Sequence, residues 1–251
     1  MARIRRPSVA SLLLRLYSGE TDLGTATGFM VKRGNGSFLV TSRHVLTGRH
    51  QTSGAPLHPT GVVPNYVGIA HNGPQRGTWK WTVEPLYTND SVPRWREHPA
   101  LGELVDLVAL PCADLEDVHI RSYDPWAPGA PLRYEITDAV NIVGFPFVTN
   151  DGRNIPVWSR AYVASDPELD FNAMPCFLVD ARTTAGAAGS PVIAYATAGV
   201  VALDDGTMTT VEKPVGRFVG VYSGRISLES DLGVVWNLDA LRAILGARAP
   251  R

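Results

Sequence analysis

Short apolar runs recur along the whole chain, and residues that favour turns separate nearly all of them. Each run has the length of a β-strand, and the 24 glycines and 19 prolines supply the breaks. Runs of this length and spacing favour an all-β barrel or sandwich over alternating β-α units. The runs lie at residues 12–17, 27–32, 38–41, 62–70, 78–83, 104–110, 140–143, 177–181, 192–196 and 218–223.

Two further segments indicate how the chain is divided. Residues 124–131 contain three prolines, which lack the backbone N–H that a central strand needs, so they predict an extended connection between two barrels. Near the C-terminus, three leucines recur at helical spacing between Asn237, a suitable N-cap, and Gly246. We therefore expect a first barrel over 1–124, a second barrel over 125–236 and a short helix over 237–246.

Composition excludes several function classes. The net charge of −1, with a short basic arm at residues 3–6, gives no electrostatic reason to expect nucleic acid or an anionic membrane as partner. No run approaches the roughly 20 apolar residues of a membrane span. We find no metal-ligand cluster and no phosphate-binding glycine loop in the sequence, so we expect neither a metal nor a cofactor.

The two cysteines, Cys112 and Cys176, are too few for the disulfide framework of a secreted domain, although a single bridge is compatible with the count. Two buried thiols in a reducing compartment are the simpler interpretation. Arg15 interrupts the first apolar run, which therefore reads as a strand rather than a secretory signal. We expect a cytoplasmic, prokaryotic protein.

Three segments carry candidate chemistry. Residues 186–191 read Gly-Ala-Ala-Gly-Ser-Pro, and glycines in such a loop allow two backbone N–H groups to point at one spot, here those of Gly186 and Ala188. His44 follows a strand that an Asn-Gly turn joins to the preceding one. Asp106 lies among Val and Leu, where a carboxylate is costly to bury without a partner, and an imidazole N–H is its natural partner.

Together these segments resemble the trypsin-like, chymotrypsin-fold serine proteases of bacteria. The family's nucleophile loop reads Gly-x-Ser-Gly-(Gly/Ser)-Pro, and its His-Asp-Ser order corresponds to His44, Asp106 and position 188. Residues 140–146 are similar to the strand that opens the family's second barrel. The resemblance spans roughly 10–245 and implies one peptidase domain of two six-stranded antiparallel β-barrels with a short C-terminal helix.

This sequence departs from the family at the nucleophile, because Ala188 stands where serine is expected. The resemblance makes His44 the general base, Asp106 the residue that orients it, and the amides of Gly186 and Ala188 the oxyanion hole. Losing the nucleophile costs on the order of 10⁶ in turnover, so we expect the chain to be inert. We favour a deliberate Ser→Ala change over a natural pseudoprotease that binds peptides or partners. Ser190 is a weaker alternative as a displaced nucleophile, since it comes two residues late.

The resemblance also suggests how a protein or peptide substrate binds. Arg182, six residues before the nucleophile, would lie at the base of the specificity pocket and pair with a substrate carboxylate, unless it points to solvent or pairs with Asp180. Arg225 is a second candidate for that cation. An extended peptide would pair with the edge strand that contains Tyr222, Ser223 and Gly224.

Position 187 bears on activation. In the trypsin group an Asp before the nucleophile pairs with a newly cleaved N-terminus, whereas Ala187 has no charge. We therefore expect no activation by cleavage. Control, if there is any, would come from a regulatory partner protein, an associated domain or an effector.

Overall fold

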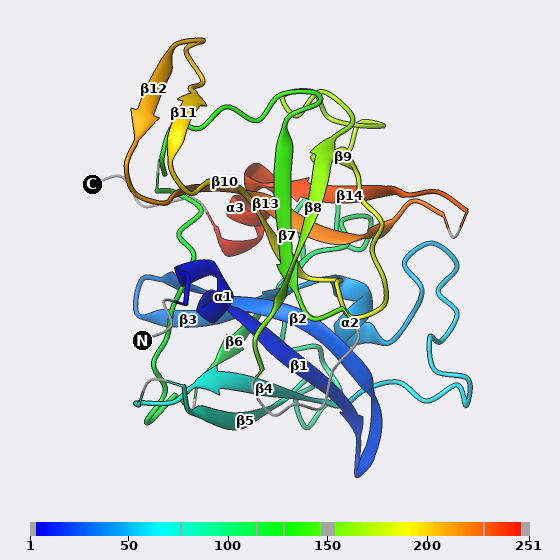
Figure 1. Cartoon of the computed structure of the whole chain (residues 1–251). Helices are drawn as coiled ribbons and strands as arrows, with labels where there is room; N and C mark the ends of the chain where they lie inside the picture. Colours follow the sequence, from blue (N-terminus) through cyan, green and yellow to red (C-terminus); the bar gives the residue numbers. More distant parts are fainter. Residues whose placement is uncertain are drawn as a thin grey trace.

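A computed structural model describes residues 4–75, 77–113, 115–127, 129–146, 154–227 and 229–246. Within this part of the chain, two six-stranded antiparallel sheets lie one after the other along the sequence (Figure 1). The first curls into a half-barrel and the second closes into a barrel, so the predicted all-β fold with a short C-terminal helix is confirmed.

The first sheet has the strand order β5-β4-β1-β2-β3-β6. Its β2-β3 hairpin closes between Arg33 and Gly36, within the predicted polar link, and its turn residues are Gly34 and Asn35, one position before the expected Asn-Gly pair. Gly34 takes a positive φ of 57°. Leu14, Met30 and Leu39 fill its interior and are almost fully buried. The strands are β1 (Ser11–Ser18), β2 (Thr21–Arg33), β3 (Gly36–Thr41), β4 (Tyr66–Asn72), β5 (Trp79–Pro85) and β6 (Val108–Cys112).

The second sheet closes in the order β10-β13-β14-β9-β8-β7. Its strands are β7 (Ala139–Gly144), β8 (Val157–Val163), β9 (Cys176–Asp180), β10 (Ser190–Ala196), β13 (Val215–Arg225) and β14 (Leu232–Asn237). A hairpin of β11 (Gly199–Ala202) and β12 (Met208–Val211) projects from this barrel between β10 and β13 (Figure 1). The run at 62–70 becomes a strand only from Tyr66, and the run at 104–110 only from Val108.

Three short helices complete the described part of the chain: α1 (Arg6–Ala10), α2 (Arg43–Thr47) and α3 (Leu238–Leu245). The side chain of Asn237 caps α3 by accepting hydrogen bonds from the amides of Asp239 and Ala240. Leu241 and Ile244 of α3 join Phe29 of the first sheet and Val221 of the second in one buried cluster. The core between the two sheets therefore includes the C-terminal helix.

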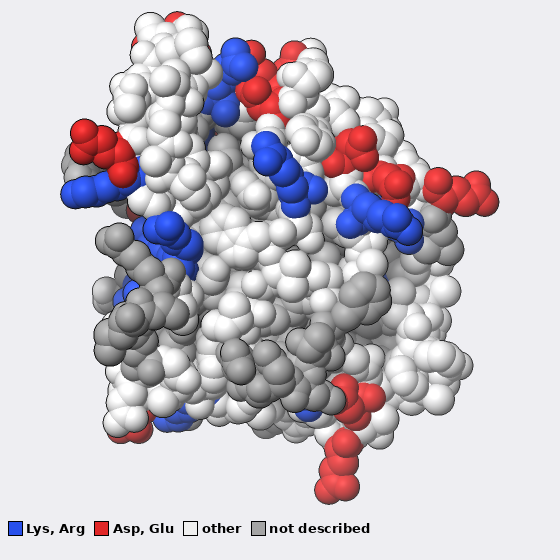
Figure 2. All heavy atoms as spheres, in the orientation of Figure 1, with Lys and Arg blue, Asp and Glu red and all other residues white. Residues whose placement is uncertain are grey.

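Surface charge and the state of the cysteines can be compared with the composition. On the face shown in Figure 2, basic and acidic side chains are interspersed, as the net charge of −1 suggests. Both cysteines, Cys112 and Cys176, are buried free thiols. Among the described residues, no helix is long and apolar enough to cross a membrane.

Candidate active site

His44 lies in the first turn of α2, immediately beyond the end of β3. The helix ends at Gly48, whose left-handed backbone (φ 63°) lets its N–H donate to the carbonyl of His44. Val45 and Leu46, the next two residues, are buried in the core of the first sheet. This anchoring fixes the backbone of His44 while a fifth of its side chain stays exposed.

Asp106 lies in the turn that precedes β6, between Val105 and Leu107, which are both fully buried. One carboxylate oxygen, Oδ2, lies 2.6 Å from Nδ1 of His44, and the other, Oδ1, accepts from the backbone N–H of His44 at 2.8 Å. The carboxylate thus holds both the ring and the backbone of the histidine. Its Nδ1 contact favours the tautomer in which Nε2 is free to accept a proton.

The same pair sets the proton affinity of the imidazole. Burial lowers the pKa of His44, whereas the charge of Asp106 and the hydrogen bond to it raise the pKa. The effect of Asp106 outweighs that of burial, so the pKa of His44 lies above its ordinary value of 6.5. A base whose pKa is raised in this way can hold a proton once it has taken one.

The loop from Gly186 to Gly189 is bonded to both sheets. Thr27 of β2 donates from its Oγ1 to the carbonyl of Gly186 at 2.8 Å and from its N–H to the carbonyl of Ala188 at 3.0 Å. Gly189 donates to the carbonyl of Tyr222 on β13 at 2.8 Å. Both glycines have positive φ, 95° at Gly186 and 83° at Gly189, where L side chains are strained.

These contacts leave two amides available. The carbonyls of Gly186 and Ala188 are turned toward β2, and within the described part of the chain the N–H groups of the same two residues have no hydrogen-bond acceptor. Two unbonded amides, two positions apart in a fixed loop, are the donors that an oxyanion needs. Both residues line the same cavity as His44.

Ala188 lines the cavity together with His44 and Gly186, and its methyl group packs against the core of the first sheet. Ser190 does not replace it. The Ser190 side chain is fully buried and donates to the carbonyl of Ala187 at 2.6 Å, on the side of the loop that faces Gly144. The structure thus excludes Ser190 as a displaced nucleophile.

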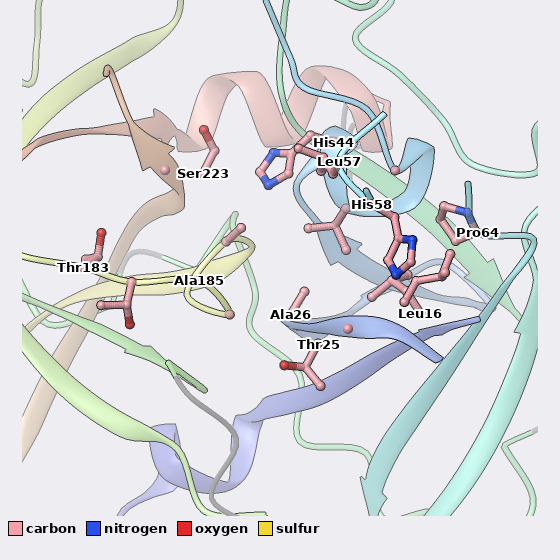
Figure 3. A pocket seen from close by; sticks show the side chains of 18 of the residues that line it. Leu16, Thr25, Ala26, His44, Leu57, His58, Pro64, Thr183, Ala185 and Ser223 are labelled. Carbon is pink, nitrogen blue, oxygen red and sulfur yellow. The ribbon is translucent and has the colours of Figure 1, made fainter. Parts of the chain in front are cut away.

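A cavity of about 400 Å³ surrounds these groups. Figure 3 shows His44 between two sets of side chains: Thr183, Ala185 and Ser223 on one side, and Leu16, His58 and Pro64 on the other. The first set comes from the second barrel, and the second set from the first sheet and the loop that follows α2. The cavity is therefore a cleft between the two sheets.

Four of the five expected substrate-binding residues line the cleft, and one does not. Tyr222, Ser223, Gly224 and Arg225 all line the cleft, at the end of β13. Arg182 does not: its side chain is exposed and contributes nothing to the cavity wall. The expectation that Arg182 forms the pocket base is therefore corrected.

The cause of this error is strand parity. Burial alternates along the extended chain from Val179, so Ala181 and Thr183 point inward while Asp180 and Arg182 point outward. Thr183 is the residue that lines the cleft. The alternation of inward and outward side chains along a strand, counted from Val179 in the sequence, would have indicated Thr183 instead of Arg182. No comparable signal marks Thr27, whose role depends on the docking of the two sheets.

This two-sheet architecture, with the cleft at the interface, is that of the chymotrypsin-like serine proteases. Solved structures share it. A serine endoprotease from Yersinia pestis matches with a TM-score of 0.50 and 12% identity over 97% of this chain, which spans 65% of that protein. A scabies mite inactivated protease paralogue matches with a TM-score of 0.50 and 14% identity over 94% of this chain and 92% of its own. No family model matches the sequence, and no curated protein does.

Proposed function

We propose that the cleft is that of a serine endopeptidase that acts on protein or peptide substrates, and that this chain is its inactive form because Ala188 replaces the nucleophilic serine. The observation that carries the proposal is the contact of His44 with Asp106 at 2.6 Å, with His44 lining the same cavity as Gly186 and Ala188, whose amides have no acceptor among the described residues. Those groups supply every element of acyl transfer except the hydroxyl.

With serine at position 188, the reaction would follow from this geometry. Nε2 of His44 would take the hydroxyl proton as the oxygen bonds to the substrate carbonyl carbon, and Asp106 would stabilise the imidazolium. The carbonyl oxygen, now negative, would accept hydrogen bonds from the two loop amides. His44 would then give its proton to the leaving amine as the peptide C–N bond breaks, and water would release the acyl group by the same route.

With alanine at position 188 no such bond can form. The loss is on the order of 10⁶ in turnover, or about 8 kcal/mol of transition-state stabilisation, which makes the chain inert as a protease. The cleft keeps its capacity to bind an extended peptide along the edge of β13.

We favour a deliberate replacement of serine by alanine. Burying a carboxylate such as Asp106, whose side chain is only 6% exposed, is costly, and the cost is offset here by its bonds to His44. A scaffold with no chemistry has little use for that pair, whereas an active site requires it. The native coding sequence at position 188 tests this part of the proposal.

A natural pseudoprotease is the second candidate. Ser190 is turned away from the cleft, so its hydroxyl does not compensate for Ala188. The scabies mite protein of the same fold is itself described as an inactivated protease paralogue. In this reading the chain would hold a peptide or a partner protein without cutting it.

Location and regulation are further parts of the proposal. Two buried free thiols, Cys112 and Cys176, suit a reducing compartment, so we place the protein in a bacterial cytoplasm. Control by a regulatory partner fits the absence of a charge at Ala187.

The test is the single change Ala188→Ser. The variant should cleave members of a broad peptide library or proteins of a bacterial lysate, read by mass spectrometry. Adding His44→Ala to the Ala188→Ser variant should reduce that cleavage by several orders of magnitude, because the triad acts as a unit. An inert Ala188→Ser variant, together with tight binding of one partner by the unaltered chain, would establish the pseudoprotease instead.

A further inference from the structure

The two sides of the cleft differ in shape, and the difference concerns which peptide bond the site would accept. The edge of β13 and the loop amides hold the acyl part of a substrate, so the amine part must lie beyond His44, which protonates it. In Figure 3 this direction runs from Thr183 and Ser223 past His44 toward Leu16 and Pro64.

The acyl side is filled by Tyr222. Its side chain is 1% exposed, and its hydroxyl lies 2.5 Å from Oγ1 of Thr183, the residue that forms the opposite wall. On its other face lies Gly233 of β14, where an added Cβ would come within 2.7 Å of the same hydroxyl. The phenol is therefore held between a side chain and a backbone, in the core of the second barrel and at the wall of the cleft.

The leaving-group side is lined mainly by apolar side chains, with His58 and Thr25 as polar groups among them. Leu16, Leu23 and Val45 form its base, and Leu57 and Val62 of the loop after α2 form its rim. Leu57 is 49% exposed and Val62 is 38% exposed, which is unusual for large apolar side chains that face one cavity. An apolar side chain bound there would remove both from water.

We infer that the cleft selects a small side chain before the scissile bond and a large apolar side chain after it, with Tyr222 deciding the first preference and Leu57 the second. The inference rests on the proposed endopeptidase function and narrows its substrates to bonds such as Ala–Leu or Gly–Phe. Tyr222 is a specificity residue here and takes no part in the proton transfers.

The experiment uses the Ala188→Ser variant and a peptide library varied on both sides of one bond. Peptides with Ala or Gly before the bond and Leu or Phe after it should be cleaved at least about tenfold faster than the same pairs reversed, since one misfit methylene alone is worth about tenfold or more. A preference for Lys, Arg or large apolar residues before the bond would overturn the inference and leave the endopeptidase intact. A preference for acidic residues there would do the same and would assign specificity to Arg225.

Substitutions test each side separately. In the Ala188→Ser background, Tyr222→Ala should admit Leu and Phe before the bond, whereas Tyr222→Phe should keep the preference for small residues. Tyr222→Val serves the same purpose if the alanine variant does not fold. Leu57→Ser should lower the preference for large apolar residues after the bond, and Leu169→Ser, at a residue 67% exposed and outside the cleft, is its matched control. Unchanged preferences in Tyr222→Val and Leu57→Ser would refute the assignment.

Binding distinguishes this inference from the proposed function. The unaltered chain should bind the same peptides with the same ranking, measured by fluorescence anisotropy. If the Ala188→Ser variant cleaves nothing but the ranking holds, the endopeptidase proposal fails and the selectivity stands. If that variant cleaves and the ranking is reversed or flat, the proposed selectivity is wrong and the endopeptidase proposal is retained.

Discussion

At the residue scale, His44 is subject to two opposing influences that can be separated by mutation. Burial lowers its pKa and Asp106 raises it. Because both effects act without the nucleophile, they can be measured separately in the inert chain by removing the charge of Asp106. We expect the His44 ring to titrate above pH 6.5 in the unaltered chain and below pH 6.5 in Asp106→Asn, where burial acts without the charge. Histidine proton shifts measured by NMR against pH would show this. A titration below 6.5 in both proteins would contradict the pairing.

The same shift makes a prediction about stability. The pKa of His44 is higher in the folded state than in the unfolded state, so its contribution to the free energy of unfolding is fully present below pH 6.5. That contribution is lost as pH rises through the folded-state pKa. Urea unfolding at a series of pH values should show the loss in the unaltered chain and not in Asp106→Asn. For the Ala188→Ser variant, kcat/KM should rise over the same interval, because the base must be neutral to act.

Gly189 is a second residue with a sharp requirement. Its φ of 83° disfavours any side chain, and an added Cβ would overlap the carbonyl oxygen of Thr27 and the hydroxyl of Thr41. Gly189→Ala should therefore lower the free energy of unfolding by about 1–3 kcal/mol from backbone strain and by a similar amount from overpacking. Gly206, with a φ of 79° and nothing within 4 Å, is the control, and Gly206→Ala should show only the strain. If urea unfolding shows the same loss of free energy of unfolding in Gly189→Ala and Gly206→Ala, contact with Thr27 and Thr41 does not contribute to the effect.

At the scale of elements, the nucleophile loop depends on β2. The hydroxyl of Thr27 donates to the carbonyl of Gly186 and accepts from the N–H of Phe145, so one side chain joins β2 to two loops of the second barrel. Thr27→Val keeps the shape and removes both bonds, leaving buried groups unsatisfied at about 1–3 kcal/mol each. We expect a lower Tm and, in the Ala188→Ser background, a lower kcat.

The matched control for Thr27 is Thr82 on β5. Its hydroxyl is also buried, and it has no hydrogen-bond partner in the described part of the chain. Thr82→Val should therefore be neutral or stabilising, since it removes an unsatisfied group. If both variants lose the same stability in thermal unfolding, the hydrogen bonds of Thr27 are not the reason for its effect.

Elements that carry a strong local signal could be predicted from the sequence. The β2-β3 hairpin follows from the Gly- and Asn-containing link at residues 32–36, although its turn lies one residue before the Asn-Gly pair. The helix α3 follows from its cap at Asn237 and its leucine spacing. The pattern of apolar runs predicts neither β8, where polar residues interrupt the pattern, nor β14, where Gly233 interrupts it. Gly233 has no side chain that could reveal its role, which is to make room for the ring of Tyr222.

In the candidate site, too, local motifs could be predicted from the sequence, whereas contacts between separate strands could not. His44, Asp106 and the loop at Ala188 belong to local motifs, and the structure brings all three to the two-sheet interface. The filled acyl side could not be predicted, because it depends on the register that sets Gly233 opposite Arg225 and under Tyr222. Such pairings join residues from separate strands and carry no periodic signal.

At the scale of the whole molecule, activation should not involve the N-terminus. Ala187 is 3% exposed and packs in the core of the second barrel, so this position offers no carboxylate to a newly formed N-terminus. The Ala188→Ser variant with an uncut N-terminal extension should thus have the same kcat/KM as the variant without it. Strict dependence on removing the extension would show that the loop needs a newly formed N-terminus after all.

The bonds of the nucleophile loop also fix when, during synthesis, a serine form of this protein could become dangerous to its cell. His44 and Asp106 leave the ribosome early, but the loop at Gly189 is bonded to Tyr222, and the strand of Tyr222 pairs in turn with β14, which ends at Asn237. A chain released before that strand has emerged has the base and no formed oxyanion site. Copies that end before β14 would therefore lack proteolytic capacity, which would arise only after that strand has been synthesised and paired with β13.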